Sequence, residues 1–340
     1  MTRRAEARAR QALRRAARAR LRDLHGIILL DKPLGVSSNQ ALQSVRRLLR
    51  AAKGGHTGAL DPQASGLLPL CFGEATKLAG NLLGARKAYL AECRLGETTD
   101  SGDREGEVLQ RRPVPVLDAP TLETALGKLR GHITQVPPLF SALKQGGERL
   151  YVKARRGETV DIPAREVDVY RLDVLSRTDD TLQLHIECGS GTYVRSLVAD
   201  LGADLGCGAH VSALRRLWLE PFRDPHMVTL EQLEQAAANG DEALLRWLLP
   251  VAAGLVDRPA VYLDAEQSAA ISRGQQLVLA PPHPVGRCAA FTVDGALLAV
   301  LELDAAGRTQ IVRGFHLPAD ARFAMPAGTA LVETPPGSVE

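Results

Sequence analysis

The residues most suited to chemistry in this chain lie in a glycine-rich segment, residues 54–69, with the sequence GGHTGALDPQASGLLP. Its one acid, Asp61, precedes Pro62, which biases Asp61 toward extended geometry, and glycines permit close backbone approach. The segment therefore predicts a loop that presents one carboxylate in a set direction. For an isolated Asp-Pro pair, a turn whose acid caps the local backbone is the simpler interpretation. His56 is the other titratable residue of the segment, so a His–Asp catalytic pair is a first hypothesis.

A helix is expected before this segment and a strand after it. Ser37 or Ser38 can cap a helix over residues 38–50. Its apolar residues recur at helical spacing, and they are Leu42, Val45, Leu48 and Leu49. Residues 67–72 are apolar and predict a buried strand. A loop between a helix and a strand is a common place for a catalytic acid.

The remaining patterns predict an α+β chain with a second, smaller module. Strand and helix patterns alternate up to Pro250 without a regular βαβ period. Further strands are expected at 26–31, 87–95, 166–177, 181–188 and 210–218, helices at 74–83, 121–131 and 192–205, and loops at 96–106 and 135–150. The second loop is basic, and loops of such length are often functional. Beyond Pro250, short apolar runs alternate with turn residues and predict a β-rich module.

The composition limits the class of protein. The chain has 340 residues, 45% hydrophobic and 24% charged, which excludes disorder throughout. Its five cysteines lie far apart without a C-x-x-C pair, which argues against a zinc site and a disulfide framework. A P-loop and a dinucleotide fingerprint are also missing, so no metal and no cofactor is expected. No apolar run approaches a membrane span, and we expect a cytoplasmic protein.

Residues 1–24 form a basic extension. The formal net charge of the whole chain is only +3, but between residues 3 and 22 many arginines accompany one acid, Glu6. These are Arg3, Arg4, Arg8, Arg10, Arg14, Arg15, Arg18, Arg20 and Arg22. The extension could be an RNA-seeking arm, the result of a composition rich in Ala and Arg, or translation from a start codon upstream of the true one. Runs of like charge are usually solvated, so the residues leave these alternatives open.

Five motifs resemble the TruB family of pseudouridine synthases, in the order in which that family carries them. GHTGALDPQASGLLPL at 55–70 resembles the catalytic motif of the family. The others are GIILLDKPLG at 26–35, RKAY at 86–89, SGTYVR at 190–195 and GAHVSALRRL at 208–217. Together they cover roughly residues 26–235.

The resemblance implies a fold and an activity. The fold is a central mixed, mainly antiparallel sheet flanked by helices, followed by a small β-rich, PUA-like RNA-binding domain. In these terms 1–24 is the basic extension, 25–250 the catalytic domain with an RNA-clamping insertion at 131–158, and 251–340 the PUA-like domain. The implied activity is isomerisation of uridine 55 in the T loop of tRNA to pseudouridine. The implied partner is the tRNA T-arm, bound by a monomer without an obligate protein partner.

The reaction breaks the bond between ribose C1′ and N1 of uracil, turns the base and rejoins it through C5. No atoms are gained or lost, so it needs no redox cofactor or metal, but one carboxylate that attacks or stabilises a cation. A second acid is not required. The resemblance makes Asp61 the nucleophile and Arg195 the cation that orients it. It makes Tyr89 the platform on which the flipped uracil stacks, and a candidate for proton transfer.

Further residues are assigned to RNA binding. The resemblance gives His56 a part in opening the RNA loop rather than in proton transfer, so the His–Asp hypothesis gives way to a single acid. Tyr193 and the main chain at Leu214 match positions that line the uracil pocket. Four cations are candidates for contacts with the RNA backbone and suggest a basic groove: Lys144, Arg149, Arg215 and Arg216.

Two other functions remain open at this point. The chain could serve mainly as a tRNA-folding RNA chaperone, because flipping a base requires disruption of the loop. It could also be a guide-dependent pseudouridine synthase of the related archaeal and eukaryotic branch. The loop at 131–158 resembles the standalone bacterial form, which clamps the RNA hairpin itself.

Overall fold

The computed structural model describes residues 21–141, 143–158 and 160–318. An eight-stranded sheet runs through them in the order β1-β3-β12-β4-β11-β10-β7, with β2 paired to β3. These strands are β1 (Gly26–Lys32), β2 (Gly54–His56), β3 (Ala64–Phe72), β4 (Lys87–Leu95), β7 (Gly131–Gln135), β10 (Arg165–Arg177), β11 (Thr181–Cys188) and β12 (Ala209–Leu219). Only the β12–β3 pair in this sheet is parallel. The expected α+β fold with a mixed, mainly antiparallel sheet is confirmed.

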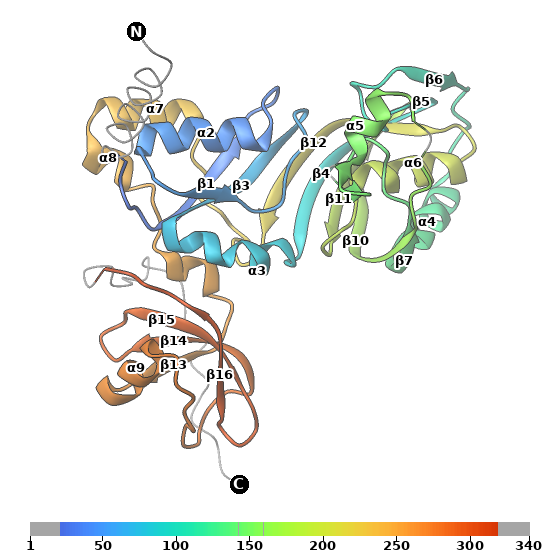
Figure 1. The fold of residues 1–340 in the computed structure, drawn as a ribbon. Helices are drawn as coiled ribbons and strands as arrows, with labels where there is room; N and C mark the ends of the chain where they lie inside the picture. The colour runs from blue at the N-terminus through green and yellow to red at the C-terminus, as the bar shows by residue number, and fades with distance from the viewer. Residues whose placement is uncertain (1–20, 142, 159, 319–340) are drawn as a thin grey trace.

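Helices cover both ends of the sheet (Figure 1). At the β1 and β3 end lie α2 (Ser38–Leu49), α7 (Leu230–Ala238) and α8 (Asp241–Leu245), and at the other end lie α4 (Ala119–Lys128) and α6 (Val194–Asp204). α2 begins as predicted, because the Ser37 side chain accepts from the Gln40 N–H and the Gln40 side chain accepts from the Ser37 N–H. This fixed start sets the direction in which the chain approaches the loop of Asp61.

Several local expectations were wrong or incomplete. Residues 74–83 form a 3₁₀ helix (Gly73–Leu78) followed by the short α3 (Ala79–Leu83). α4 begins before Thr121, because Asp118 accepts a hydrogen bond from the Thr121 N–H and so caps the helix. The two expected loops contain β5 (Glu97–Thr99), β8 (Lys144–Gln145) and β9 (Glu148–Arg149); β6 (Val108–Arg111) follows the first loop, and α5 (Leu150–Arg155) begins at the end of the second. Strands of two to four residues are too short to leave a period in the sequence.

The C-terminal part is β-rich, as predicted. Its four-stranded sheet has the order β13-β14-β15-β16. The strands are β13 (Ala260–Leu263), β14 (Gly286–Thr292), β15 (Leu297–Leu303) and β16 (Thr309–Gly314), and α9 (Ala265–Ser272) lies beside them. Phe291 and Val300 of this sheet belong to one buried cluster with Ile27, Leu78 and Phe222. Hydrophobic contact therefore joins the C-terminal sheet to the β1 end of the large sheet.

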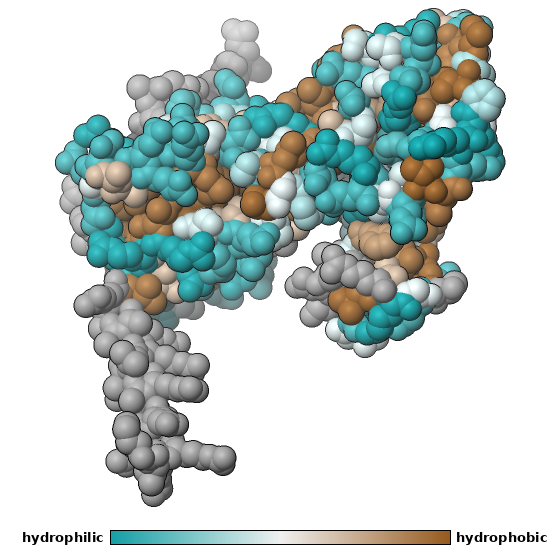
Figure 2. Space-filling model, turned by 90° about the horizontal axis from the view of Figure 1, so that it is seen from above, coloured by the Kyte–Doolittle hydropathy of each residue, from teal (hydrophilic) through white to brown (hydrophobic). Residues whose placement is uncertain are grey.

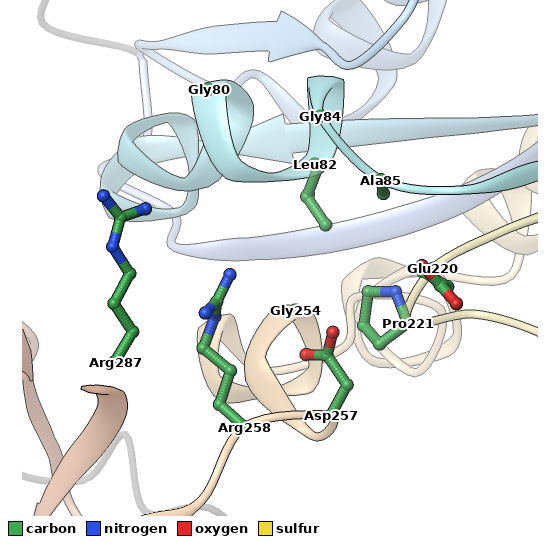
Figure 3. Close-up of a pocket in the computed structure, with 10 residues that line it drawn as sticks. All are labelled: Gly80, Leu82, Gly84, Ala85, Glu220, Pro221, Gly254, Asp257, Arg258 and Arg287. Atoms are coloured by element: carbon green, nitrogen blue, oxygen red, sulfur yellow. The ribbon is translucent and has the colours of Figure 1, made fainter. Parts of the chain in front are cut away.

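A cavity of about 350 Å³ lies next to this junction (Figure 3). Asp257 and Arg258 point into it toward α3, and Arg287 reaches it from β14. The cavity thus carries both signs of charge, and Asp61 is not among its lining residues. Elsewhere, the face seen in Figure 2 is mainly hydrophilic, with hydrophobic residues in separate patches.

Candidate active site

Asp61 lies in the loop between β2 and β3, and hydrogen bonds hold the loop on both sides of it. The Ser38 hydroxyl donates to the Leu60 carbonyl at 2.9 Å and accepts from the Leu60 N–H at 2.8 Å. The Gly35 N–H donates to the Pro62 carbonyl at 2.9 Å. About half of the Asp61 side chain, 48%, is exposed. The carboxylate is therefore fixed in direction and still accessible.

Lys32, at the end of β1, is a second support of this loop. Its buried ammonium donates to the carbonyls of Pro33 at 2.8 Å, Val36 at 2.7 Å and Pro62 at 3.4 Å. Burial lowers the pKa of Lys32 to about 8, and the nearby Asp61 carboxylate opposes that change. We did not predict this role, although the lysine lies within the first motif.

Arg195 connects Asp61 to two other segments. It lies in the first turn of α6 with only 5% of its side chain exposed, and its Nη2 is 3.1 Å from Asp61 Oδ2. Its Nη1 is 3.4 Å from Asp103 Oδ2. The guanidinium also donates to the carbonyls of Ser101 and Phe140, both at 2.8 Å. The structure thus brings the predicted Asp61–Arg195 pair together across 134 positions of sequence (195 − 61).

Asp103 is a site residue that sequence reasoning missed. It lies between β5 and β6 and shares Arg195 with Asp61, so the expectation of a single acid is incomplete. The pKa of Asp61 is raised, mainly by burial; Arg195 opposes this, while Asp103 and Glu105 add to it and Lys32 opposes it. The Thr-, Asp- and Gly-rich sequence around Asp103 is that of an ordinary turn, so no local signal marks the residue.

Tyr89 lies on β4, opposite Arg216 on β12 in the register of the sheet. Only 8% of the tyrosine is exposed, and burial raises the pKa of its phenol to about 12. A hydrogen bond from Arg216 to the phenol opposes that rise. The Asp61 carboxylate adds to the rise, so the predicted nucleophile and the predicted platform interact electrostatically.

The predicted basic groove is changed by the structure. Arg216 is 1% exposed, so its assignment to the RNA backbone was wrong: alternation along β12 turns its side chain into the protein. Its neighbour Arg215 is partly exposed and makes two hydrogen bonds to Asp31, at 2.9 and 2.7 Å. Lys144 and Arg149 lie in the β8–β9 pair, and their side chains are outside the described part of the structure. Phosphate contacts by these three remain predictions.

His56, the last residue of β2, and Tyr193, just before α6, come from different elements. The pKa of His56 is lowered by burial and by Arg216, which favours the neutral imidazole. Tyr193 directly precedes α6, and its main chain is held by Gln135, whose amide accepts from the Tyr193 N–H at 2.8 Å and donates to the Tyr193 carbonyl at 3.1 Å. The guanidinium of Arg165 lies 4.9 Å from the centre of the Tyr193 ring. Gln135 is a further support that the sequence did not reveal.

Leu214 lines a narrow cavity next to Asp61. The residue is paired with Ala64 across the parallel strands β12 and β3. Asp61, Arg195 and Asp103 line the same cavity. The parallel pair thus places Leu214 beside the cavity that Asp61 lines.

Metal-binding clusters and membrane-spanning helices are both absent from the described residues. No group of three or more His, Cys, Asp or Glu side chains within them is arranged to hold a metal ion. No helix in residues 21–141, 143–158 and 160–318 is long and apolar enough to cross a membrane.

Two family models match the chain. The TruB family pseudouridylate synthase N-terminal domain matches residues 46–194, and the tRNA pseudouridylate synthase B C-terminal domain matches residues 195–256. Similar curated proteins are the tRNA pseudouridine synthases B of Xanthomonas campestris, 54% identical over 88% of this chain and 96% of the relative, and of Xylella fastidiosa, 54% identical over 88% and 99%.

Solved structures share the fold. A Cbf5-Nop10-Gar1 complex matches with a TM-score of 0.67 at 24% identity, over 88% of both chains. An H/ACA RNP bound to a substrate RNA that contains 2′-deoxyuridine matches with a TM-score of 0.67 at 23% identity, over 88% of this chain and 87% of the other. At these identities the likeness concerns the fold alone.

Proposed function

The chain belongs to the TruB family of tRNA pseudouridine synthases, and on this premise we propose that it isomerises uridine 55 in the T loop of tRNA with Asp61 as nucleophile. The observation that carries the proposal is the fixed, half-exposed Asp61 carboxylate held by the buried Arg195 at 3.1 Å. A nucleophilic carboxylate must be ionised, and the Arg195 guanidinium favours the ionised form because it lowers the pKa of Asp61, which burial raises.

The proposed reaction uses few groups of the chain. Asp61 attacks the target nucleoside or stabilises the cation formed when the bond from C1′ to N1 breaks. The detached uracil turns, C1′ bonds to C5, the C5 proton leaves and N1 gains a proton. With a pKa of about 12, Tyr89 stays protonated at neutral pH and would meet the base as a neutral ring and hydroxyl. Tyr193 and the Leu214 main chain would border the base, and His56 would act on the RNA loop.

We also propose a division of the chain. Residues 1–24 would be the basic extension, 25–250 the catalytic domain and 251–340 a PUA-like RNA-binding domain. The insertion at 131–158 would clamp the RNA. Two hydrogen bonds connect this insertion to α6: the Ser196 hydroxyl donates to the Val136 carbonyl at 2.8 Å, and Arg195 donates to the Phe140 carbonyl at 2.8 Å. Residues 1–20 and 319–340 lie outside the described residues.

Replacement of Asp61 tests the proposed function. The substrate is a T-arm hairpin with tritium at C5 of uridine, because C5 loses its hydrogen in the reaction. We expect Asp61→Asn to abolish tritium release while the hairpin is still bound. Asp179→Asn is the matched control, because Asp179 is an exposed carboxylate in the turn between β10 and β11. Full activity of Asp61→Asn would disprove the assignment.

The same RNA and the same Asp61→Asn variant distinguish the two alternative functions. A guide-dependent synthase would be inactive on naked transcript, whereas we expect activity without guide RNA or protein partners. A chaperone role independent of catalysis would persist in Asp61→Asn, measured as tRNA annealing. The monomeric state and the cytoplasmic location remain predictions.

A further inference from the structure

Arg216 is a buried arginine with an unusual set of partners. It is 1% exposed, and among the described residues no carboxylate lies within ion-pair distance of it. Its Nε donates to the Leu67 carbonyl at 2.7 Å and its Nη2 to the Gly58 carbonyl at 3.0 Å. Burial of a guanidinium without a counter-ion is unfavourable in free energy, so we expect Arg216 to have a function that explains its retention.

These partners belong to the two sides of the proposed site. Gly58 and Leu67 lie before and after Asp61 in the catalytic segment, and the third partner is the Tyr89 phenol. β12 lies between β3 and β4, and Arg216 is in register with Gly66 on one neighbour and with Tyr89 on the other. One side chain therefore contacts both the segment that carries the nucleophile and the tyrosine beneath the base.

Gly66 shows how close this arrangement is. Its φ is +96°, and a Cβ added there would lie 2.1 Å from the Arg216 carbonyl oxygen. On the other edge of β3, Gly66 is in register with Lys32 of β1, whose ammonium donates to the Pro62 carbonyl. The glycine thus allows β12 to approach β3 closely at Arg216.

We propose that Arg216 is a positioning residue, which fixes the distance between Asp61 and the Tyr89 phenol by bonding the catalytic segment at Gly58 and Leu67. This inference rests on the proposed function of the site. It differs from the phosphate contact expected from the sequence, because a buried guanidinium neutralises no phosphate. It also differs from a general role in packing, because the contacts end on the two groups that must meet the same nucleoside.

The first test compares rate and binding. In single-turnover reactions on the labelled T-arm hairpin, Arg216→Met should be about 10- to 100-fold slower, because misplacement by about 1 Å costs up to that much. The hairpin Kd should change less than about twofold, and the slope of log K against log salt should not change. A weaker Kd with a slope reduced by about one unit and an intact rate would make Arg216 a phosphate contact and overturn the proposal.

Conservative variants separate positioning from charge and from folding. Arg216→Lys keeps the charge but lacks the planar fork, so we expect it to be slow as well. Tyr89→Phe should fold and should react more slowly without losing RNA affinity. In the double variant, Arg216→Met should add little to this loss of rate, because both substitutions remove the same contact. Full rate in Arg216→Lys or in Tyr89→Phe, or losses that simply multiply in the double variant, would overturn the inference.

Amide hydrogen exchange, measured without substrate, distinguishes the positioning role of Arg216 from the proposed function of the site. Amide hydrogen exchange in residues 57–68 should accelerate in Arg216→Met, while exchange in the β13–β16 sheet stays unchanged. Unchanged exchange in 57–68 would contradict the positioning role. An inactive wild-type protein with this exchange response would instead refute the proposed function and leave the anchoring by Arg216 in place.

Discussion

Replacement of Arg195 should slow the reaction and move its pH dependence. The guanidinium contacts Asp61 at 3.1 Å, Asp103 at 3.4 Å and two main-chain carbonyls at 2.8 Å. Arg195→Met removes all of these contacts and leaves two neighbouring carboxylates without that cation. Arg195→Lys keeps the charge, but a compact ammonium cannot span the same partners.

The size of the effect follows from the exposure of the pair. A hydrogen bond to a charged group contributes about 1.5–3 kcal/mol, and we use this range because the Asp61 side chain is half exposed. If the contact is fully used in the transition state, its loss slows the chemical step roughly 10- to 150-fold. The pKa of Asp61 also rises, because Arg195 is the largest influence that lowers it. Since attack needs the ionised form, the acid limb of the rate profile should move to higher pH.

The assay is single-turnover tritium release from the T-arm hairpin between about pH 5 and pH 8. Arg246→Met is the control, because it removes an exposed arginine that pairs with Glu242 four residues earlier. We expect this control to match the wild type in rate and in pH profile. The reasoning is refuted if both Arg195 variants keep the wild-type rate and the same acid limb.

Three further predictions follow from the site and its supports. Asp103→Asn should move the acid limb to lower pH, the opposite direction, because Asp103 raises the pKa of Asp61; a limb that stays in place or moves up would contradict this. Gly66→Ala should lower the free energy of unfolding in urea by at least about 1–3 kcal/mol because of its positive φ and the contact with β12, whereas Gly127→Ala, with open space around it, should not; equal stabilities would be evidence against it. The pKa of Lys32 is about 8 in the folded chain against the ordinary 10.5, so between about pH 8 and pH 10.5 the unfolded chain binds more protons and the free energy of unfolding should rise with pH. Lys32→Met should show a smaller rise when the free energy of unfolding is measured in urea at several pH values. Identical dependence on pH in the variant and the wild type would exclude the effect.

The elements around Asp61 could be predicted from the sequence because their signals are local. Ser37 caps α2 by bonding three residues ahead, and the apolar run of β3 is a continuous buried strand. The Asp61–Arg195 pair came from the resemblance, since no local pattern joins residues so far apart. Short elements such as β5 and β8 escaped prediction, because they are stabilised by their partner strands rather than by a period of their own.

The sequence by itself determined the family, the loop that presents Asp61 and the elements on either side of it, because glycine, proline and capping residues act on the backbone within a few positions. Only the tertiary structure decided how the cations are used. Arg215 and Arg216 are neighbours of the same type, yet one meets Asp31 at the surface and the other is buried against Tyr89. Successive side chains of a strand point to opposite faces, and what each face meets comes from segments distant in sequence. For the same reason Asp103 joins the site: burial and Coulomb interaction depend on distance in space.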